Sequence, residues 1–495
     1  MTVHEETQFI SIAAPPHAHQ PCIMFAIQSH EIRQPMADKF GVRESFDLYG
    51  AFWKPEEPDS KFTGRLARNK QVIELTTSPT FKALTVDDLP SLFERERQTI
   101  EVLHGTTEHG PCTLFWLQSL SPGGRTDLQT LEVLEFRTFR VSLCIFGLHI
   151  SSATAPILQS ACFGYSSLQE WIPRRPEREQ TGDHITLTHS LALPAAFDVC
   201  STAERIRIEL DVVPRMQHHA SGEYQVRNEP QLTVEPAEPR SVEWFLDIAY
   251  RFENFFSVLL GTSVCVLSIA AKHEGEVGWF VRRIRNKMQK PDPTIWVRCD
   301  GSQLAEAALR WLSTPEEFRS FENLVYGTIR NSSLYVETEF LSLAQALESF
   351  HRLTDPVTIV TPESFDGILR SVKEAIHNIC RAESEIASKL DECVQHANDV
   401  SFQQRIKGLF SRLNGDNLRR LLGSPEEFEQ TLRQTRNYFT HAGIRKQTKV
   451  LIDAGKLFLF NQKLHALLRL LVLVHLGFPE SIVFEPIFQQ SRKWA

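Results

Sequence analysis

One arginine and one histidine near the C-terminal end of the chain have the chemistry to cleave RNA without a metal ion. Arg436 and His441 are five residues apart, and Asn437 follows the arginine. Attack of a ribose 2′-hydroxyl on the adjacent phosphate needs a base that titrates near neutrality, which an imidazole supplies. It also needs a fixed cation for the charge of the phosphorane, and a guanidinium matches phosphate geometry. We predict that Arg436 neutralises the phosphate, that His441 is base or acid, and that the Asn437 amide orients one of them.

The spacing alone is not specific, because a surface arginine followed by a histidine at a helix end gives the same pattern. The basic residues around the pair are one candidate for contact with RNA. The net charge of the chain is −8, so contact with RNA must use a local basic patch. The stretch 430–449 holds five bases and no acid. Besides Arg436, we predict that its four other basic residues bind RNA: Arg433, Arg445, Lys446 and Lys449.

The helix that must position these residues has a clear beginning and end in the sequence. Ser424 can cap its first turn, and Pro425 fits the first helical position. Glu427 stands where the carboxylate of a capping box reaches back. Gly443 supplies the stop. One apolar face is expected to pack against the rest of a bundle, and it consists of Phe428, Leu432, Thr435 and Phe439.

On such a helix, five residues correspond to a rotation of about 140°. Arg436 and His441 therefore do not face one phosphate side by side. Either the chain unwinds at 442–443 and lets the imidazole move, or two copies of the chain bring their motifs together across a two-fold axis.

Short sequence segments in and around this helix resemble those of a known family. The string Arg436-Asn437-Tyr438-Phe439-Thr440-His441 resembles the R-N-x-x-x-H signature of HEPN domains. Three strings resemble the HEPN domain of ApeA-type defence proteins in the same order: FLSLAQALESFHRL (340–353), SFQQRIKGLF (401–410) and TRNYFTHAG (435–443). The string FDLYGAFWKPEEPDSKFTGRL (46–66) is similar to the N-terminal domain of those proteins.

The resemblance implies an up-and-down helical bundle, a homodimer formed through that bundle, and a catalytic site shared by the two copies. It implies a metal-independent endoribonuclease that acts on RNA such as tRNA, is toxic to its own cell, and protects against phage by abortive infection. The expected products carry a cyclic phosphate and a 5′-hydroxyl. Glu348 is expected to orient Arg436 from a facing helix, and Tyr438 is expected to stack on a base, although surface exposure and core packing explain them equally well.

Length and pattern predict an α+β multidomain protein. Residues 1–40 are expected to be a loose N-terminal segment. Residues 41–303 contain many β-branched and aromatic runs, which predict an antiparallel β-rich sandwich or barrel-like domain with a helix. This helix is expected at 241–260, and its dense aromatic face is expected to lie in the core. Residues 304–478 predict the all-α HEPN helical bundle. Its helices include a long one from about 362 to 396, with an apolar stripe of Ile368, Val372, Ile376 and Ile379. Residues 479–495 form a C-terminal tail that is expected to add an extended segment.

The composition indicates the cellular compartment of the protein and the kinds of chemistry that its residues do not support. The nine cysteines show no C-x-x-C pair, which is typical of reduced thiols, so we expect a cytoplasmic protein. We predict no cofactor and no metal, because paired histidines such as His218 and His219 lack nearby acids or cysteines at ligand spacing. No stretch predicts contact with a membrane. Motifs for nucleotide binding or serine hydrolysis are not found.

Two functional hypotheses remain open at this point. In the first, the β-rich domain senses a trigger such as a phage protein and the HEPN bundle cleaves RNA. In the second, the bundle is catalytically inert and serves dimerisation beside a β-sandwich binding domain, so that Arg436 and His441 are structural.

Overall fold

The structure is a computed structural model that describes residues 8–10, 23–27, 45–69, 72–77, 80–83, 99–127, 132–171, 177–181, 184–188, 197–200, 205–218, 224–282, 297–331, 333–380, 383–441 and 449–492. The chain divides into two compact units. The first consists of Met1–Phe256, Val264–Pro293 and Asp300–Ala305, and the second of Ser257–Ser263, Thr294–Cys299 and Glu306–Ala495. The domain boundaries predicted from the sequence stay a prediction.

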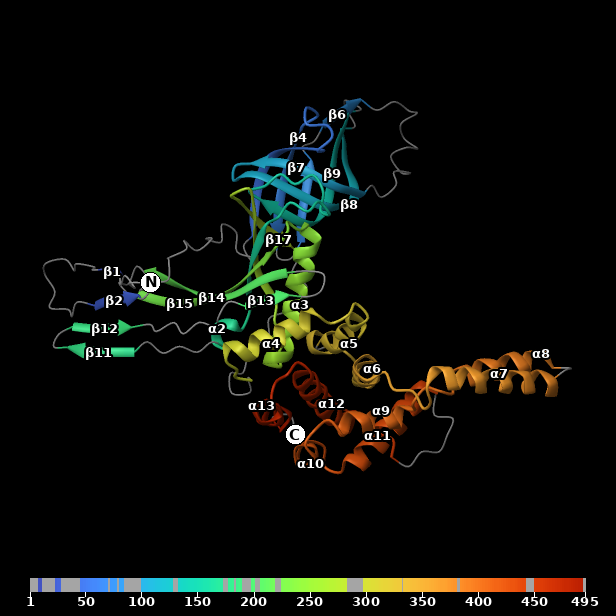
Figure 1. Ribbon diagram of the computed structural model, residues 1–495. Helices are drawn as coiled ribbons and strands as arrows, with labels where there is room; N and C mark the ends of the chain where they lie inside the picture. Colours follow the sequence, from blue (N-terminus) through green and yellow to red (C-terminus); the bar gives the residue numbers. More distant parts are fainter. Residues whose placement is uncertain are drawn as a thin grey trace. The chain divides into compact units, whose positions relative to one another are not determined.

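Six antiparallel strands of the first unit close into a barrel (Figure 1). They follow one another in the order β9-β5-β4-β3-β7-β8, and β8 also pairs with β9. Apolar and polar residues alternate along these strands. Because successive side chains of a strand point to opposite faces, the apolar side chains fill the interior. The strands are β3 (Phe46–Trp53), β4 (Phe62–Asn69), β5 (Val72–Thr77), β7 (Thr99–Thr107), β8 (Gly110–Asp127) and β9 (Glu132–Phe146).

The buried interior of the barrel is almost entirely apolar. Its members come from all six strands and from one neighbouring strand: Leu48, Phe52, Leu66, Ile73, Leu75, Leu103, Cys112, Leu114, Leu117, Phe139, Val141, Cys144, Phe146 and Val281. The predicted barrel-like β domain is thereby confirmed.

The sheet continues beyond the barrel from the end of β9. Strands join it in the order β17 (Glu276–Arg282), β16 (Val266–His273), β10 (Ser160–Tyr165), β15 (Tyr224–Pro236), β14 (Arg205–His218) and β13 (Phe197–Cys200). β6 (Thr80–Ala83) pairs with β9. A separate four-stranded sheet consists of β1 (Gln8–Ile10), β2 (Ile23–Ile27), β12 (His184–Thr188) and β11 (Glu177–Thr181). The first two of these fall in the segment 1–40, most of which lies outside the described residues.

The predicted aromatic helix is α3 (Val242–Leu260), which follows β15, and a short helix α2 (Leu168–Trp171) precedes β11. Four phenylalanines of α3 are buried, as the sequence predicts: Phe245, Phe252, Phe255 and Phe256. The end of this helix is fixed by the buried Arg469, which donates to the backbone carbonyls of Val258 and Leu259 at 2.6 and 2.7 Å.

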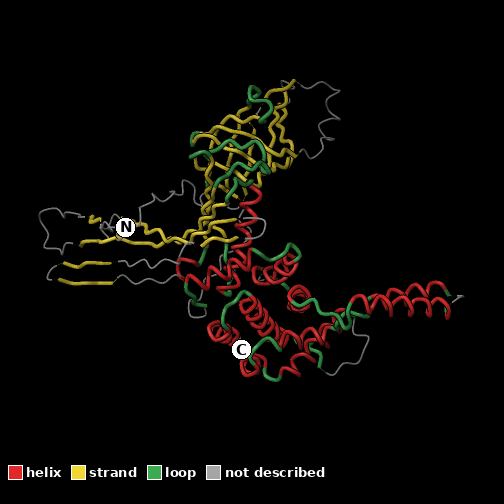
Figure 2. Tube along the Cα trace, viewed as in Figure 1, coloured by secondary structure: helices red, strands yellow, loops and turns green. Residues whose placement is uncertain are grey.

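The second unit is helical (Figure 2), which confirms the predicted α+β class. Its helices are α4 (Gly301–Leu312, from residue 306), α5 (Phe318–Arg330), α6 (Val336–Thr354), α7 (Pro362–Ile379), α8 (Ser384–Gln395), α9 (Phe402–Phe410), α10 (Gly415–Leu422), α11 (Pro425–Thr440), α12 (Ala454–His475) and α13 (Glu480–Arg492). Helix α6 packs against α5, α9, α11 and α12 and thus forms the centre of the bundle.

Two helical predictions differ from the structure. The sequence predicts one long helix from about 362 to 396, but the helix breaks at 380–383 into α7 and α8, which lie side by side (Figure 1). The apolar stripe on α7 was expected to face the core, yet α7 contains no buried residue. The C-terminal tail is not extended. It folds as α13, because Val483, Phe484 and Ile487 give it an apolar face that is buried.

Within the described residues, one helix has the length and apolar composition of a membrane span. This helix is α12, with a mean hydropathy of 1.5 over its most apolar window. Because 61% of that window is buried inside the protein, α12 has the pattern of a core helix.

Candidate active site

Helix α11 begins where the sequence predicts, although one of its predicted caps is different. The Ser424 hydroxyl accepts a hydrogen bond from the backbone N–H of Glu427 at 3.2 Å, and Pro425 occupies the first turn. The capping box does not form, because the Glu427 carboxylate pairs with Lys449 at 3.0 Å. Phe428, Leu432 and Thr435 are buried as expected, so the register of the helix is set by its apolar face.

The helix ends at His441. Its backbone N–H still donates to the carbonyl of Asn437 at 3.0 Å, but its ψ of 23° departs from helical geometry. The imidazole is exposed and makes no hydrogen bond or ion pair with the residues that the structure describes. The predicted stop at Gly443 and two predicted RNA-binding residues, Arg445 and Lys446, lie outside the described residues.

Arg436 is held by two neighbouring helices. Its Nη2 donates to Oε2 of Glu348 on α6 at 3.2 Å. Its guanidinium also lies over the ring of Phe402, at the start of α9, with 5.1 Å to the ring centroid. The side chain remains 29% exposed, whereas that of Glu348 is 12% exposed. The contact expected between Glu348 and Arg436 is therefore present, and its orienting role stays a prediction.

Glu348 is shared between two arginines. Its Oε1 accepts from Nη2 of Arg352 at 3.1 Å, one turn further along α6. The other end of the Arg352 guanidinium lies 3.9 Å from Asp399. The sequence analysis did not select Arg352, although its spacing of four residues from Glu348 predicts a pair on one helix face.

A third guanidinium belongs to this group. Arg405 on α9 is 3% exposed, and its Nε has no hydrogen-bond partner within the described part of the chain. Burial lowers its pKa, the charge of Arg352 lowers it further, and the carboxylates of Glu348 and Asp399 raise it. We call Arg352, Arg405 and Arg436 the arginine cluster. Three positive charges face the two carboxylates, so the cluster keeps a net charge of +1 and can accept an anion.

The remaining predicted site residues do not join this cluster. Arg433 pairs with the buried Glu429 at 3.0 Å, and Lys449 pairs with Glu427, so nearby acids already neutralise both bases. Tyr438 is half-buried and packs edge-on against Phe439 at 5.5 Å between ring centroids. Asn437 is half-buried one residue after Arg436, and its carbonyl accepts from His441.

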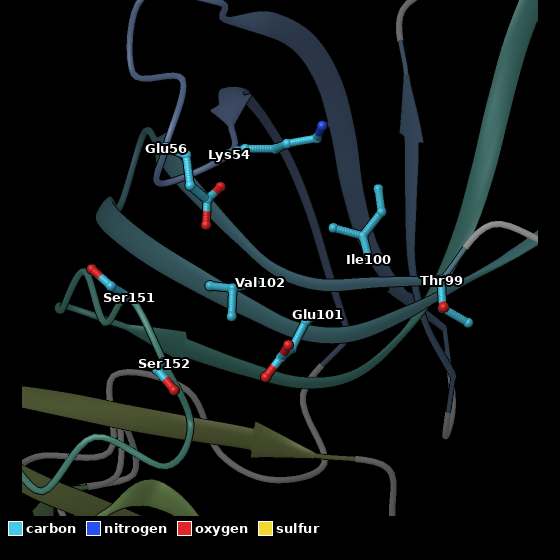
Figure 3. A pocket seen from close by; sticks show the side chains of 8 residues that line it. All are labelled: Lys54, Glu56, Thr99, Ile100, Glu101, Val102, Ser151 and Ser152. Atoms are coloured by element: carbon cyan, nitrogen blue, oxygen red, sulfur yellow. The ribbon is translucent and has the colours of Figure 1, made fainter.

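A cavity of about 350 Å³ lies in the barrel unit (Figure 3). It is lined by Lys54, Glu56, Thr99, Ile100, Glu101, Val102, Ser151 and Ser152. This lining contains no imidazole or guanidinium. The cavity therefore lacks the two groups found in the second unit, which are an imidazole base at the end of α11 and the guanidiniums of the arginine cluster. In the part of the chain that the structure describes, no group of three or more His, Cys, Asp or Glu side chains could hold a metal ion.

Comparison with known proteins assigns the class and then the family. Residues 341–482 match the Apea-like HEPN domain, which covers the arginine cluster and His441. Residues 47–297 match ApeA N-terminal domain 1. The chain therefore belongs to the ApeA family, as its sequence resemblance predicts. No curated protein and no solved structure matches the chain. HEPN domains are typically RNases, and this architecture points to anti-phage defence and a nuclease-like function.

Proposed function

We propose that the protein is a metal-independent endoribonuclease in which Arg436 and His441 act on one RNA phosphate. The observation that carries the proposal is the position of Arg436. Its guanidinium is fixed by Glu348 and Phe402, yet 29% of the side chain is exposed. Five residues later the same helix ends in the exposed imidazole of His441.

The chemistry follows from these two groups. An imidazole takes the proton of the ribose 2′-hydroxyl, the 2′-oxygen attacks phosphorus, and the bond from phosphorus to the 5′-oxygen breaks. A second imidazole, in its protonated form, gives a proton to the leaving 5′-oxygen. The Arg436 guanidinium stabilises the added charge on the phosphorane. The products are a 2′,3′-cyclic phosphate and a 5′-hydroxyl, and none of these steps requires a metal ion.

The direction of the two side chains supports a site shared by two copies. The α-helical hydrogen bond from His441 to Asn437 keeps the residue in register with α11. Arg436 and His441 therefore leave the helix about 140° apart. Two copies related by a two-fold axis can place both motifs in one cleft, and this arrangement supplies the two imidazoles that the reaction uses.

The β-rich unit would then act as the sensor. A nuclease that attacks the RNA of its own cell needs an inactive state, and a large unit without the catalytic pair is suited to hold it there. We propose that a phage protein is the trigger, that tRNA or another structured RNA is the substrate, and that the enzyme acts in the cytoplasm.

The test compares cleavage of total RNA by wild-type protein, His441→Ala and Arg436→Ala in EDTA. We expect cleavage by the wild type alone, with cyclic-phosphate and 5′-hydroxyl ends. His396 is a matched control, because it is also exposed at the C-terminal end of a helix, and His396→Ala should cleave like the wild type. Cleavage that persists in His441→Ala, or that needs a divalent ion, contradicts the proposal. If the wild type is silent, the same comparison is made in cells infected with phage. No difference between wild type and His441→Ala in that assay favours the inert dimerisation module.

A further inference from the structure

Exposed apolar side chains are concentrated in one segment of the second unit. Thirteen large apolar side chains are exposed among the described residues, and eight of them belong to 357–390. They are Val357, Ile359, Val360, Ile368, Val372, Ile379, Ile386 and Leu390. Such a concentration marks an interaction surface, because isolated exposed apolar residues are ordinary but clustered ones are not.

The segment is a two-helix arm formed by α7 and α8. The two helices pack on each other and make no extensive contact with another described helix or strand, and they project from the bundle (Figure 1). His377 on α7 bonds to Asp391 on α8 at 2.9 Å. Ala387 is the one residue of the arm's described helices that is buried.

Each helix of the arm has a second apolar face that the hairpin leaves uncovered. On α7, the half-buried Phe365, Leu369 and Ile376 form one face. Ile368, Val372 and Ile379 form another and are 52%, 36% and 83% exposed. On α8, Ile386 and Leu390 are one turn apart and are 50% and 41% exposed. Burial of apolar side chains is favourable, so a partner that covers these stripes would stabilise the arm.

We propose that the arm of a second copy covers these stripes. Two antiparallel hairpins that pair through apolar faces give a four-helix bundle, which is a common solution for amphipathic helices. A two-fold axis makes such a contact self-complementary, because the same stripes meet on both sides. Standard interfaces take about 20–30 residues from each partner. The two helices hold 18 and 12 residues, and those on their uncovered faces can contribute to such a contact together with Val357, Ile359 and Val360 at the base of the arm.

The base of the arm is continuous with the candidate active site. The Asn398 side chain accepts from the backbone N–H of Val360 and donates to its carbonyl. These bonds join the segment before α7 to the segment after α8. The next residue, Asp399, faces Arg352 of the arginine cluster at 3.9 Å. Phe402, three residues further, lies under Arg436. Two arms that pair with their bases at the same end would bring the second copy beside the cluster. The idea that this pairing completes the catalytic cleft rests on the proposed function. The idea that the arms pair does not depend on the proposed function.

The test is the molar mass of the full chain in solution by light scattering, together with RNA cleavage. We expect two chains for the wild type and one for Ile368→Glu combined with Leu390→Glu. Both residues are substantially exposed within one chain, so the double variant should keep the wild-type helix content, which circular dichroism measures. Asn378→Glu is the matched control, because it adds a carboxylate to an exposed position of α7 away from the stripe, and it should remain a dimer.

A monomeric wild type, or a double variant that remains a dimer, overturns the arm pairing. A monomeric double variant that has lost RNA cleavage supports both the pairing and the shared site. A monomeric double variant that still cleaves RNA as well as the wild type leaves the arm pairing in place and refutes the shared site. The two ideas can therefore fail separately.

Discussion

Arg436 on α11 and Glu348 on α6 form an ion pair across the bundle, with 3.2 Å between Nη2 and Oε2. The carboxylate is the less exposed partner, with 12% of its side chain exposed against 29% for Arg436. The same carboxylate holds Arg352. One acid therefore organises two members of a cluster whose net charge remains positive.

Glu348→Gln should reduce the rate of RNA cleavage about 10-fold, because the neutral amide holds Arg436 less firmly and a misplaced guanidinium stabilises the transition state less. The change is expected mainly in kcat, with the melting temperature close to that of the wild type. Glu426→Gln, in the exposed first turn of α11, is the control. Equal rates for both variants would show that the ion pair serves the fold alone.

Arg352→Met should weaken RNA binding and lower the salt dependence of the binding constant by about one phosphate contact. The reason is that the variant removes the most exposed guanidinium of the cluster, whose side chain is 51% exposed. Fluorescence anisotropy with an RNA hairpin at several salt concentrations measures this slope, with the catalytic His441→Ala background preventing cleavage. Arg419→Met removes an exposed charge that already pairs with Asp416 on α10 and should leave the slope unchanged. An unchanged slope for Arg352→Met places the RNA elsewhere.

The barrel provides a test of its own packing. Arg68 on β4 is 2% exposed, and none of its three guanidinium nitrogens has a hydrogen-bond partner among the residues that the structure describes. Burial accordingly lowers its pKa. Because an unpaired buried charge opposes folding, Arg68→Met should stabilise the barrel by about 1–3 kcal/mol. Arg65→Met is the control three residues earlier, where the arginine is exposed and pairs with Asp47. Chemical denaturation measures both, and a less stable Arg68→Met would contradict the unpaired state.

One buried histidine predicts an acid-sensitive bundle. Burial, and after it the charge of Arg412, lower the pKa of His351 below 6.5. The unfolded chain therefore binds more protons than the folded one as pH falls below 6.5. The stability contributed by neutral His351 is complete above that pH and is lost as pH falls through the lowered pKa, by up to about 1.4 kcal/mol per pH unit. Melting curves between pH 8 and 5 should show this loss.

His351→Gln should flatten that pH profile, whereas the exposed His396→Gln should leave it as it is in the wild type. A profile that is flat in the wild type would refute the effect of burial.

The sequence predicts the parts of this molecule that depend on neighbours in the chain. The helix α11 is predicted by its capping residues Ser424 and Pro425 and by its apolar face. The positions of Arg436 and His441 on this helix follow directly. Arg405 was missed because its role depends on α6 and α9 packing together, which no spacing in the sequence shows. The stripe on α7 was assigned to the core because periodicity reveals an apolar face but not what covers it.

The most direct measurement of the central claim, one cleft built from two copies of Arg436 and His441, is a mixing experiment. A fixed amount of wild-type protein is exchanged with increasing amounts of His441→Ala, and RNA cleavage in EDTA is followed. If both copies serve one cleft, random pairing should lower cleavage to about one half at equal amounts and about one quarter at a threefold excess. Adding Ile368→Glu and Leu390→Glu to the His441→Ala chain should abolish this inhibition. Cleavage that stays constant while mixed dimers form would contradict the account, because each chain would then carry a complete site of its own.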